Sequence, residues 1–327
     1  MSQATTVHQS VMMSEVMECF DYLSEIENPV FLDCTLGGAG HSEALLKKFP
    51  DLFVLAIDQD PDALERAKVR LAEYSDRLIL ARCNFRDLDG LVSELFKQKA
   101  IPYRSNLKLF DGIIADLGIS SDQLADPDRG FSFLQDSPLD MRMDPSAEQG
   151  AASLLNESSK SELQSIFRKG GMGAVSGVLA AKVIDSRPIN STAEFASVCE
   201  SIGELNTRPG RSAATVPFQA VRIAVNDELG AASELIDSVH QFLSPGASVC
   251  VISFHSLEDK IVAKGMRSWE RGEQVPRRIP QQGGVTGIGK LLTKKALLPG
   301  EEEIGINPRA RSSMMRIFRR NEKGVGE

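Results

Sequence analysis

A glycine-rich turn is the feature of this sequence that points most directly to chemistry. It covers residues 33–41, Asp-Cys-Thr-Leu-Gly-Gly-Ala-Gly-His, between a short apolar run and an amphipathic segment. Glycines let the backbone approach a ligand closely, and the start of the following helix offers unpaired N–H groups. We expect the turn to bind a small-molecule cofactor. The alternative is a tight turn with no ligand.

The spacing inside the turn argues against a dinucleotide. The fingerprint G-x-G-x-x-G fails, because Gly38 and Gly40 are followed by Glu43 where a third glycine would stand. An acidic side chain there favours a cationic or neutral ligand over a diphosphate. Asp58 follows Gly40 by 18 residues, close to the roughly 20 expected for a carboxylate that binds ribose hydroxyls. Such turns also occur in S-adenosylmethionine-dependent enzymes.

Other strand ends carry residues that could complete the site. Asp33 ends the first predicted strand, Asn84 and Phe85 follow the third, and Asp116 ends the fourth. In an open parallel sheet, ligands bind beyond the carboxyl ends of the strands, where the strand order reverses. Phe85 could stack on an adenine, although a lone phenylalanine more often packs in a core. Asp116 could accept a proton from an amine that receives a methyl group.

The residues narrow the reaction but leave the methyl acceptor open. Methylation at C5 of cytosine needs a cysteine nucleophile, and no Pro-Cys pair occurs in the chain. Methylation of an amine needs only alignment and a proton acceptor. Many base amino-methyltransferases carry Asp/Asn/Ser-Pro-Pro-aromatic at this strand end. This chain has Asp116-Leu117-Gly118 instead.

Two further patterns argue against other classes of protein. Residues 284–290 nearly match a phosphate-binding P-loop, but Leu291 stands where Ser or Thr would bind magnesium, and no apolar strand precedes the segment. A nucleoside triphosphatase is therefore excluded. The five cysteines are scattered singly with no C-x-x-C pair, so we expect neither a disulfide framework nor a metal site.

The elements that must position these residues alternate along the chain. Apolar runs followed by amphipathic segments are typical of a parallel sheet covered by helices. The predicted strands cover residues 30–32, 53–57, 78–81, 110–115 and 248–253, with a closing strand at 312–318, and the predicted helices cover 41–49, 61–74, 87–99 and 217–243. A capping-box pattern at Ser256–Asp259 opens another helix. The fold class is α/β, with a parallel-rich twisted sheet.

An all-helical domain interrupts this alternation. Residues 117 to 145 are rich in Asp, Pro, Ser and Gly, which predicts a loop. Residues 146 to 205 carry only helical patterns, including 161–167 and 193–202, with Ser191 or Thr192 as a cap. We therefore predict one α/β domain at 1–116 and 213–327, and an inserted all-helical domain at 117–212.

The charge is distributed unevenly. The net charge is −8, yet residues 264–327 hold 14 Lys and Arg against 7 Asp and Glu, a net of +7. Such a basic tail favours a polyanionic partner, with a solvated surface as the alternative. No apolar run approaches the ~18 residues of a membrane span, and the N-terminus lacks the layout of a signal peptide. We expect a cytoplasmic protein without a membrane partner.

Segments along the whole chain resemble the ribosomal RNA small subunit methyltransferase H family. They are residues 8–12, 33–42, 56–61, 116–124, 129–133, 138–144, 218–229, 253–259 and 307–313. The resemblance implies N4-methylation of a cytidine in the decoding centre of 16S ribosomal RNA, with S-adenosylmethionine as cofactor. It also implies that the α/β domain is a Rossmann-like class I methyltransferase domain with a basic C-terminal tail, and that the inserted helical domain serves substrate recognition. The chain departs from the family pattern at 169–173 and 212–217. These departures concern how the insertion binds its substrate.

The resemblance also implies site residues. Cofactor contacts fall on Ala39, Gly40, His41, Asp58, Phe85, Asp116 and Gln123. Asp116 and His255 are the candidate catalytic residues, although a structural role for His255 is an equal alternative. Arg309, Arg311 and Arg142 are the candidate RNA contacts, and an Arg142–Asp140 pair is an equal alternative for the last.

Several points stay open at the level of sequence. The general base, the oligomeric state, for which a homodimer is compatible, and the choice between naked RNA and the assembled small subunit are not determined. An inactive RNA-binding or assembly factor is an alternative function, and cofactor binding would discriminate it. A small-molecule or protein methyltransferase is another, which the basic tail disfavours.

Overall fold

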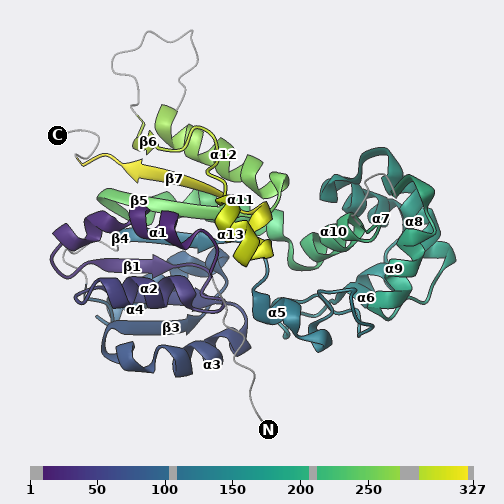
Figure 1. Cartoon of the computed structure of the whole chain (residues 1–327), viewed down its shortest axis with the longest axis horizontal. Helices are drawn as coiled ribbons and strands as arrows, with labels where there is room; N and C mark the ends of the chain where they lie inside the picture. Colours follow the sequence, from purple (N-terminus) through teal and green to yellow (C-terminus); the bar gives the residue numbers. More distant parts are fainter. Residues whose placement is uncertain (1–9, 103–108, 206–211, 273–286, 323–327) are drawn as a thin grey trace. The chain divides into compact units, whose positions relative to one another are not determined.

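The computed structural model describes residues 10–102, 109–205, 212–272 and 287–322. His8 and Gln9 of the first motif, and residues 284–286 of the P-loop-like segment, lie outside these ranges. The chain forms two units, the first from residues 1–118 and 231–327 and the second from residues 119–230 (Figure 1).

The first unit is built on a seven-stranded sheet with the order β3-β2-β1-β4-β5-β7-β6. The strands are β1 (Val30–Asp33), β2 (Phe53–Asp58), β3 (Leu78–Arg82), β4 (Phe110–Asp116), β5 (Leu243–Ser253), β6 (Gly289–Leu291) and β7 (Met314–Arg320). Strands β1 to β5 are parallel, and β7 is antiparallel to both of its neighbours. Since β1 lies between β2 and β4, the strand order reverses there, which is where such sheets bind ligands.

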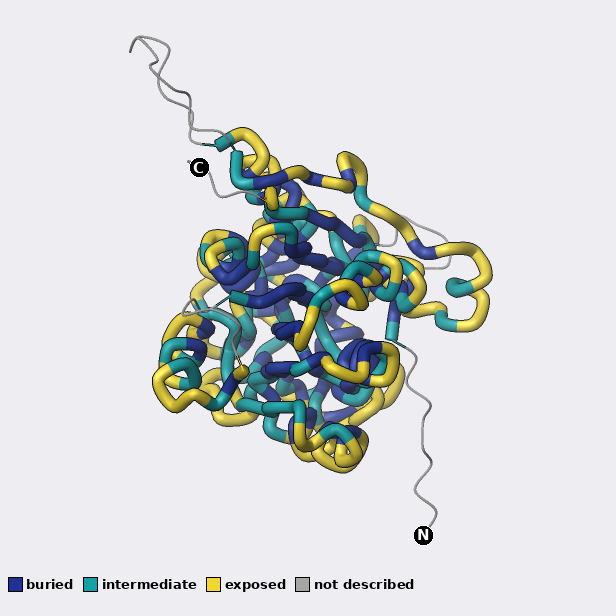
Figure 2. Tube along the Cα trace, turned by 90° about the vertical axis from the view of Figure 1, so that its left-hand side faces the viewer, coloured by how far each residue is buried: buried dark blue, intermediate teal, exposed yellow. Residues whose placement is uncertain are grey.

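Helices cover both faces of this sheet, because successive apolar side chains of a strand point to opposite faces and both faces must be buried. Leu55 and Ile57 of β2 join one core cluster with residues of α4 (Leu88–Lys97), α11 (Glu228–Val239) and α12 (Ser256–Arg271). Val54 and Ala56 join the other, with residues of α1 (Met13–Cys19), α2 (Gly40–Lys48) and α3 (Pro61–Arg70). Figure 2 shows the central strands in the buried colour. A two-sided apolar strand of this kind is typical of a parallel sheet.

The second unit is helical. It contains α5 (Ser121–Ala125), α6 (Ala151–Glu157), α7 (Lys160–Phe167), α8 (Ser176–Asp185), α9 (Thr192–Glu200) and α10 (Thr215–Asn226). Its core includes Phe167, Phe195 and Phe218, all buried. Ser191 caps α9 in a capping box with Glu194, as the sequence indicated for that helix start. None of the helices described in either unit is long and apolar enough to cross a bilayer.

The second unit extends further along the chain than the sequence indicated. We expected the insertion to end at residue 212, whereas this unit runs to Gly230, because α10 packs against α6 and α7. The predicted helix 217–243 is two helices, broken at Asp227, which adopts a left-handed conformation with φ 44°. The predicted loop 117–145 contains the short helix α5, whose start is a capping box between Ser120 and Gln123.

Candidate functional site

The glycine-rich turn connects β1 to α2 and is fastened to strands on both sides. The Thr35 hydroxyl accepts a hydrogen bond from the Asp116 backbone N–H at 2.6 Å. On the other side, the Gly37 N–H donates to Oδ2 of Asp58 at 2.8 Å. The turn therefore bridges the carboxyl ends of β2 and β4, at the point where the strand order reverses.

The turn depends on residues that tolerate unusual backbone geometry. Gly37 has φ 48° and Ala39 has φ 63°, both in the left-handed region. A Cβ on Gly40 would lie 2.2 Å from the Ser10 hydroxyl oxygen, so any other residue there would displace the Ser10 side chain. Ala39 is the N-cap of α2 and provides no side-chain acceptor for the first N–H groups of the helix. Such groups suit the carboxylate or hydroxyls of a ligand.

Asp33 supports the turn from beneath. It is 2% exposed, its Oδ1 accepts from the Thr35 N–H at 3.0 Å, and its Oδ2 accepts from the Ser42 hydroxyl at 2.6 Å. Burial raises its pKa to about 6, although both hydrogen bonds favour the charged form. Asp33 is a positioning residue rather than a ligand contact.

Asp58 lies at the end of β2 with lone pairs still available. Each carboxylate oxygen accepts one backbone N–H, from Gly37 and from Asp60 at 2.9 Å. A carboxylate can accept roughly four hydrogen bonds in all. Burial raises its pKa to about 6, and the nearby charges of Asp60 and Asp33 add to this effect. The site suits a hydroxyl-bearing ligand that also brings positive charge.

Asp116 ends β4 and faces His41. Its Oδ1 atom is buried and has no hydrogen-bond partner among the described residues, and its Oδ2 atom lies 3.9 Å from Nδ1 of His41. Burial raises the pKa of Asp116 well above its ordinary value, and the charges of Asp33 and Glu258 raise it further. A buried carboxylate oxygen without a donor is costly, which fits a group that meets a ligand.

His41 is buried, and its ring forms a hydrogen bond with a backbone group of the segment that precedes α1. Its Nε2 atom lies 2.9 Å from the carbonyl oxygen of Val11. Burial lowers the pKa of His41 to about 4, so the ring is neutral and Nε2 carries its hydrogen.

Phe85 begins a 3-10 turn, Phe85–Asp87, directly after β3. Its side chain packs against the core cluster on the α4 side of the sheet and is partly exposed. The preceding Asn84 caps this turn and donates from Nδ2 to Oε1 of Gln59 at 2.8 Å. Phe85 therefore combines a core contact with partial exposure, at a position just after the carboxyl end of β3.

His255 is the N-cap of α12, one residue before the cap that the sequence pattern indicated. Its Nδ1 accepts from the Glu258 N–H at 3.2 Å, and its own N–H donates to Oε2 of Glu258 at 3.3 Å. The buried Glu258 also accepts from the Phe254 N–H at 2.9 Å. These bonds give His255 a structural role at the carboxyl end of β5, and leave its predicted catalytic role a prediction.

In the second unit, Gln123 and Arg142 both make local bonds. Gln123 is buried, and its Oε1 accepts from the Ser120 N–H at 3.0 Å.

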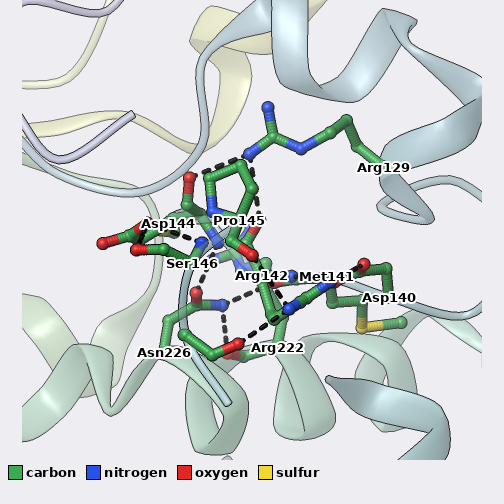
Figure 3. A network of polar contacts seen from close by, with 11 residues as sticks. Arg129, Asp140, Met141, Arg142, Asp144, Pro145, Ser146, Arg222 and Asn226 are labelled. Atoms are coloured by element: carbon green, nitrogen blue, oxygen red, sulfur yellow. Dashed lines mark hydrogen bonds and ion pairs between the residues drawn. The ribbon is translucent and has the colours of Figure 1, made fainter. Parts of the chain in front are cut away.

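Arg142 forms a bidentate pair with Asp140, with both bonds at 2.7 Å, and donates to the carbonyl oxygens of Pro145 and Ala147 (Figure 3). The Asp140–Arg142 alternative is thus present, and the use of these donors inside the loop favours it over an RNA contact.

The side chains of Arg129 and Asn226, which lie outside this loop in the sequence, form hydrogen bonds with its backbone. Arg129 donates to the carbonyl oxygens of Arg142 and Met143, at 2.9 and 2.8 Å (Figure 3). Asn226 accepts from the Met143 N–H at 2.7 Å and donates to the Met141 carbonyl oxygen at 2.8 Å. Met141 has φ 62°, a strained conformation that these contacts stabilise.

Arg309 and Arg311 lie in a 3-10 helix, Pro308–Ser312, directly before β7. Both are exposed. Since Met314 at the start of β7 pairs with Ser253 at the end of β5, this segment adjoins the carboxyl edge of the parallel strands. The two arginines are therefore on the same edge of the first unit as Asp58 and Asp116.

Sequence reasoning missed three residues that organise the site: Thr35, Ser42 and Val11. Thr35 and Ser42 are hydroxyl residues within or just after the glycine-rich turn, a position from which such side chains commonly bond backbone groups or carboxylates. Val11 acts through its backbone carbonyl oxygen, so no side-chain signal could have revealed it.

The carboxyl groups at the strand ends fit a cationic nucleoside cofactor. Three carboxyl groups, Asp33, Asp58 and Asp116, end three adjacent strands with no cationic side chain paired to them in the described part of the chain, and the pKa of each is raised. A positively charged ligand would relieve this arrangement. A diphosphate would worsen it.

Comparison with known proteins identifies the family of this chain. The model of the MraW methylase family matches residues 5–321. The chain belongs to this methylase family. It is similar to proteins named Ribosomal RNA small subunit methyltransferase H, from Synechococcus elongatus (40% identity, covering 89% of this chain and 88% of that one) and from Clostridioides difficile (37%, 95% and 97%). The predicted α/β methyltransferase fold, with S-adenosylmethionine as methyl donor, is confirmed.

A solved structure described as a putative rRNA-methylase from Clostridium thermocellum aligns over 93% of this chain and 95% of its own, with a TM-score of 0.38 and 9% identity. A likeness at this level adds nothing to the family assignment.

Proposed function

We propose that this methyltransferase modifies the N4 amine of a cytidine in the decoding centre of 16S ribosomal RNA, within the small subunit and in the cytoplasm. The observation that carries the proposal is the match over almost the full length of both chains to relatives named for ribosomal RNA of the small subunit. The row of carboxyl groups at the carboxyl edge of the sheet supports an amine as the acceptor, because amine methylation needs a proton acceptor and no cysteine nucleophile.

Residues of the first unit would hold the cofactor. The Asp58 carboxylate would accept from the ribose hydroxyls, the backbone from Ala39 to His41 would contact the methionine part, and Phe85 would stack on the adenine. When bound, S-adenosylmethionine supplies a methyl group on a positively charged sulfur. Burial raises the pKa values of Asp58 and Asp33, and the positive charge of this ligand would favour their charged forms.

Asp116 would take the proton that the reaction releases. As the cytidine nitrogen bonds to the methyl carbon, the carbon–sulfur bond breaks and one N–H proton must leave. A carboxylate whose pKa is raised accepts a proton more readily near neutral pH than an ordinary aspartate does. His41, neutral and fixed by Val11, is part of the support for this group and not a second acid.

Gln123, which follows the Asp116 strand end in the sequence, remains a predicted cofactor contact. The other predicted contacts concern the substrate, and we assign the second unit to substrate recognition. Arg309 and Arg311, exposed at the same sheet edge as Asp116, would contact RNA phosphates.

The proposal is tested by methyl transfer with product identification. The protein and isotopically labelled S-adenosylmethionine would be incubated with unmethylated small subunits and, separately, with naked 16S RNA, and the RNA digested to nucleosides for mass spectrometry. The expected product is N4-methylcytidine. A label in another nucleoside or in a protein would overturn the proposal, and failure to bind S-adenosylmethionine in calorimetry would favour an inactive assembly factor.

A further inference from the structure

One face of α12 carries a line of cations. Lys260, Lys264, Arg267 and Arg271 are all exposed and follow one another at intervals of four, three and four residues. With 3.6 residues per turn, this spacing places them within about 60° of one another around the helix axis and over about 16 Å along it. We call these four residues the α12 stripe.

The opposite face of α12 packs into the core, and this packing turns the stripe toward solvent. Val262, Met266 and Trp269 are buried in the core cluster on that side of the sheet. Helix α12 also packs against β6 and β7 at the far edge of the sheet (Figure 1). The orientation of the stripe is therefore fixed by the core and does not depend on its own charges.

The acidic residues of α12 do not neutralise the stripe. Glu258 is buried in the capping box with His255, and Asp259 forms a bidentate pair with Arg316 of β7. Glu270 accepts a hydrogen bond from the Leu291 N–H at 3.1 Å. Among the described residues, no carboxylate forms an ion pair with any of the four stripe cations.

This contrasts with other cations of the first unit. Lys48 pairs with Asp21, Lys68 with Glu65, and Arg70 with Glu43. In a chain of net charge −8, acidic groups are abundant, yet no carboxylate in the described part of the chain pairs with the stripe.

The stripe leads toward the site. Helix α12 starts just after Ser253, at the carboxyl end of β5, so Lys260 is the stripe residue nearest the edge that carries Asp116 and Arg271 is the farthest. A linear array of unpaired cations that starts near a reaction centre is the arrangement expected for a surface that tracks a polyanion backbone.

We propose that the α12 stripe binds the phosphate backbone of the substrate RNA, independently of its sequence. This inference rests on the proposed function, since RNA is the polyanion that the reaction requires. The stripe raises affinity and contributes to the salt dependence of binding, whereas residues at the strand ends carry out the chemistry.

The test compares two double variants of equal charge. Lys264→Gln/Arg267→Gln removes two stripe cations, and Lys47→Gln/Lys97→Gln removes two exposed cations at the ends of α2 and α4. We expect the stripe variant to bind 16S RNA about tenfold or more weakly at ~0.1 M salt, and its plot of log affinity against log salt to lose about 1.4 units of slope. The control variant should keep the affinity and slope of the wild type.

Two further readouts separate this inference from the rest of the account. Both variants should bind S-adenosylmethionine as the wild type does, and the stripe variant should show a raised KM for RNA with an unchanged kcat. If the wild type methylates its RNA and the stripe variant matches the control in affinity and slope, the inference is wrong while the proposed function stands. If the wild type transfers no methyl group to 16S RNA, the proposed function fails and this inference fails with it.

Discussion

The Nδ1 atom of His41 lies 3.9 Å from the Oδ2 atom of Asp116, and the tautomer of His41 decides what this proximity means. Because Nε2 donates its hydrogen to the Val11 carbonyl oxygen, Nδ1 of the neutral ring presents a lone pair. That lone pair cannot neutralise a carboxylate. Asp116 therefore remains a buried base with a raised pKa, which is the property that proton acceptance requires.

Replacement of this carboxyl group should abolish turnover without unfolding the protein. In Asp116→Asn, the amide can still accept a hydrogen bond but cannot take up a proton. We expect single-turnover methyl transfer to fall by about 100-fold or more, with a similar loss in Asp116→Ala. Thermal unfolding and the Kd for S-adenosylmethionine serve as controls. Full turnover in either variant would refute the role of Asp116.

Loss of the Asp58 carboxylate should weaken cofactor binding. Hydrogen bonds to a charged acceptor contribute roughly 1.5–3 kcal/mol, so Asp58→Ala should raise the Kd for S-adenosylmethionine by about 10- to 100-fold in calorimetry. Asp76→Ala removes an exposed carboxylate beside the start of β3, at the opposite edge of the sheet, and should leave the Kd unchanged. Equal Kd values for both variants would argue against a ribose contact at Asp58.

The buried charge of Asp33 should make stability depend on pH. Its pKa is about 6 in the folded protein and 3.8 as the ordinary value, so the charged form is disfavoured by folding above pH 6. This cost, about 3 kcal/mol, is fully present at pH 7.5 and disappears as the pH falls through 6 toward 4. His41, with its pKa lowered to about 4, acts in the opposite direction, since its buried neutral ring loses stability as the pH falls below 6.5.

Asp33→Asn isolates the first of these effects. The free energy of unfolding of the variant, relative to the wild type, should be higher at pH 7.5 than at pH 4 by about 3 kcal/mol, measured by urea unfolding at both values. A difference between the two proteins that does not change with pH would show that Asp33 does not titrate as its burial indicates.

Two helix glycines should respond oppositely to alanine. A Cβ on Gly265 of α12 would lie 2.0 Å from Cγ2 of Ile236 in α11, so Gly265→Ala should destabilise the protein by about 1–3 kcal/mol. A Cβ on Gly90 of α4 meets nothing within 4 Å, so Gly90→Ala should stabilise by about 0.5–1 kcal/mol. Denaturant unfolding of both variants checks the pair. Equal effects would mean that α11 and α12 are not so closely packed.

The loop that Asn226 holds should open when its amide is lost. Asn226→Ala removes the bonds to Met143 N–H and to the Met141 carbonyl oxygen, each worth about 1 kcal/mol. We expect faster hydrogen exchange at the Met143 amide, with little change in the strands of the first unit. Asn226→Asp, which retains only the accepting bond, should give an intermediate rate. Unchanged exchange would contradict the network in Figure 3.

The sheet could be predicted because its strands are buried on both faces. The apolar runs at 30–32, 53–57, 78–81 and 110–115 all correspond to strands β1 to β4, and the residues that follow them mark the ligand edge. Strand β5 begins at Leu243, earlier than predicted, because Ser244-Pro245-Gly246 has the composition of a turn although Gly246, with φ 79°, sits within the strand. Strand β6 has only three residues and depends on its pairing with β7, which local sequence does not encode.

The site was predictable in its side chains and not in its backbone. Asp58 and Asp116 were indicated by strand ends, a position that periodicity alone locates. The role of Val11 could not be predicted, since it acts through a carbonyl oxygen. The cap of α12 was assigned to Ser256 because serine is a strong N-cap, whereas Glu258 at the third helical position selects His255.

The central claim is that a sulfonium cofactor lies across the carboxyl ends of the parallel strands, between Asp58 and Asp116. A crystal structure of the protein soaked with S-adenosylmethionine tests it directly. We predict ribose hydroxyls within hydrogen-bond distance of the Asp58 carboxylate and the methyl group directed toward Asp116. A cofactor bound elsewhere, or this edge occupied only by a phosphate-bearing nucleotide, would contradict the account.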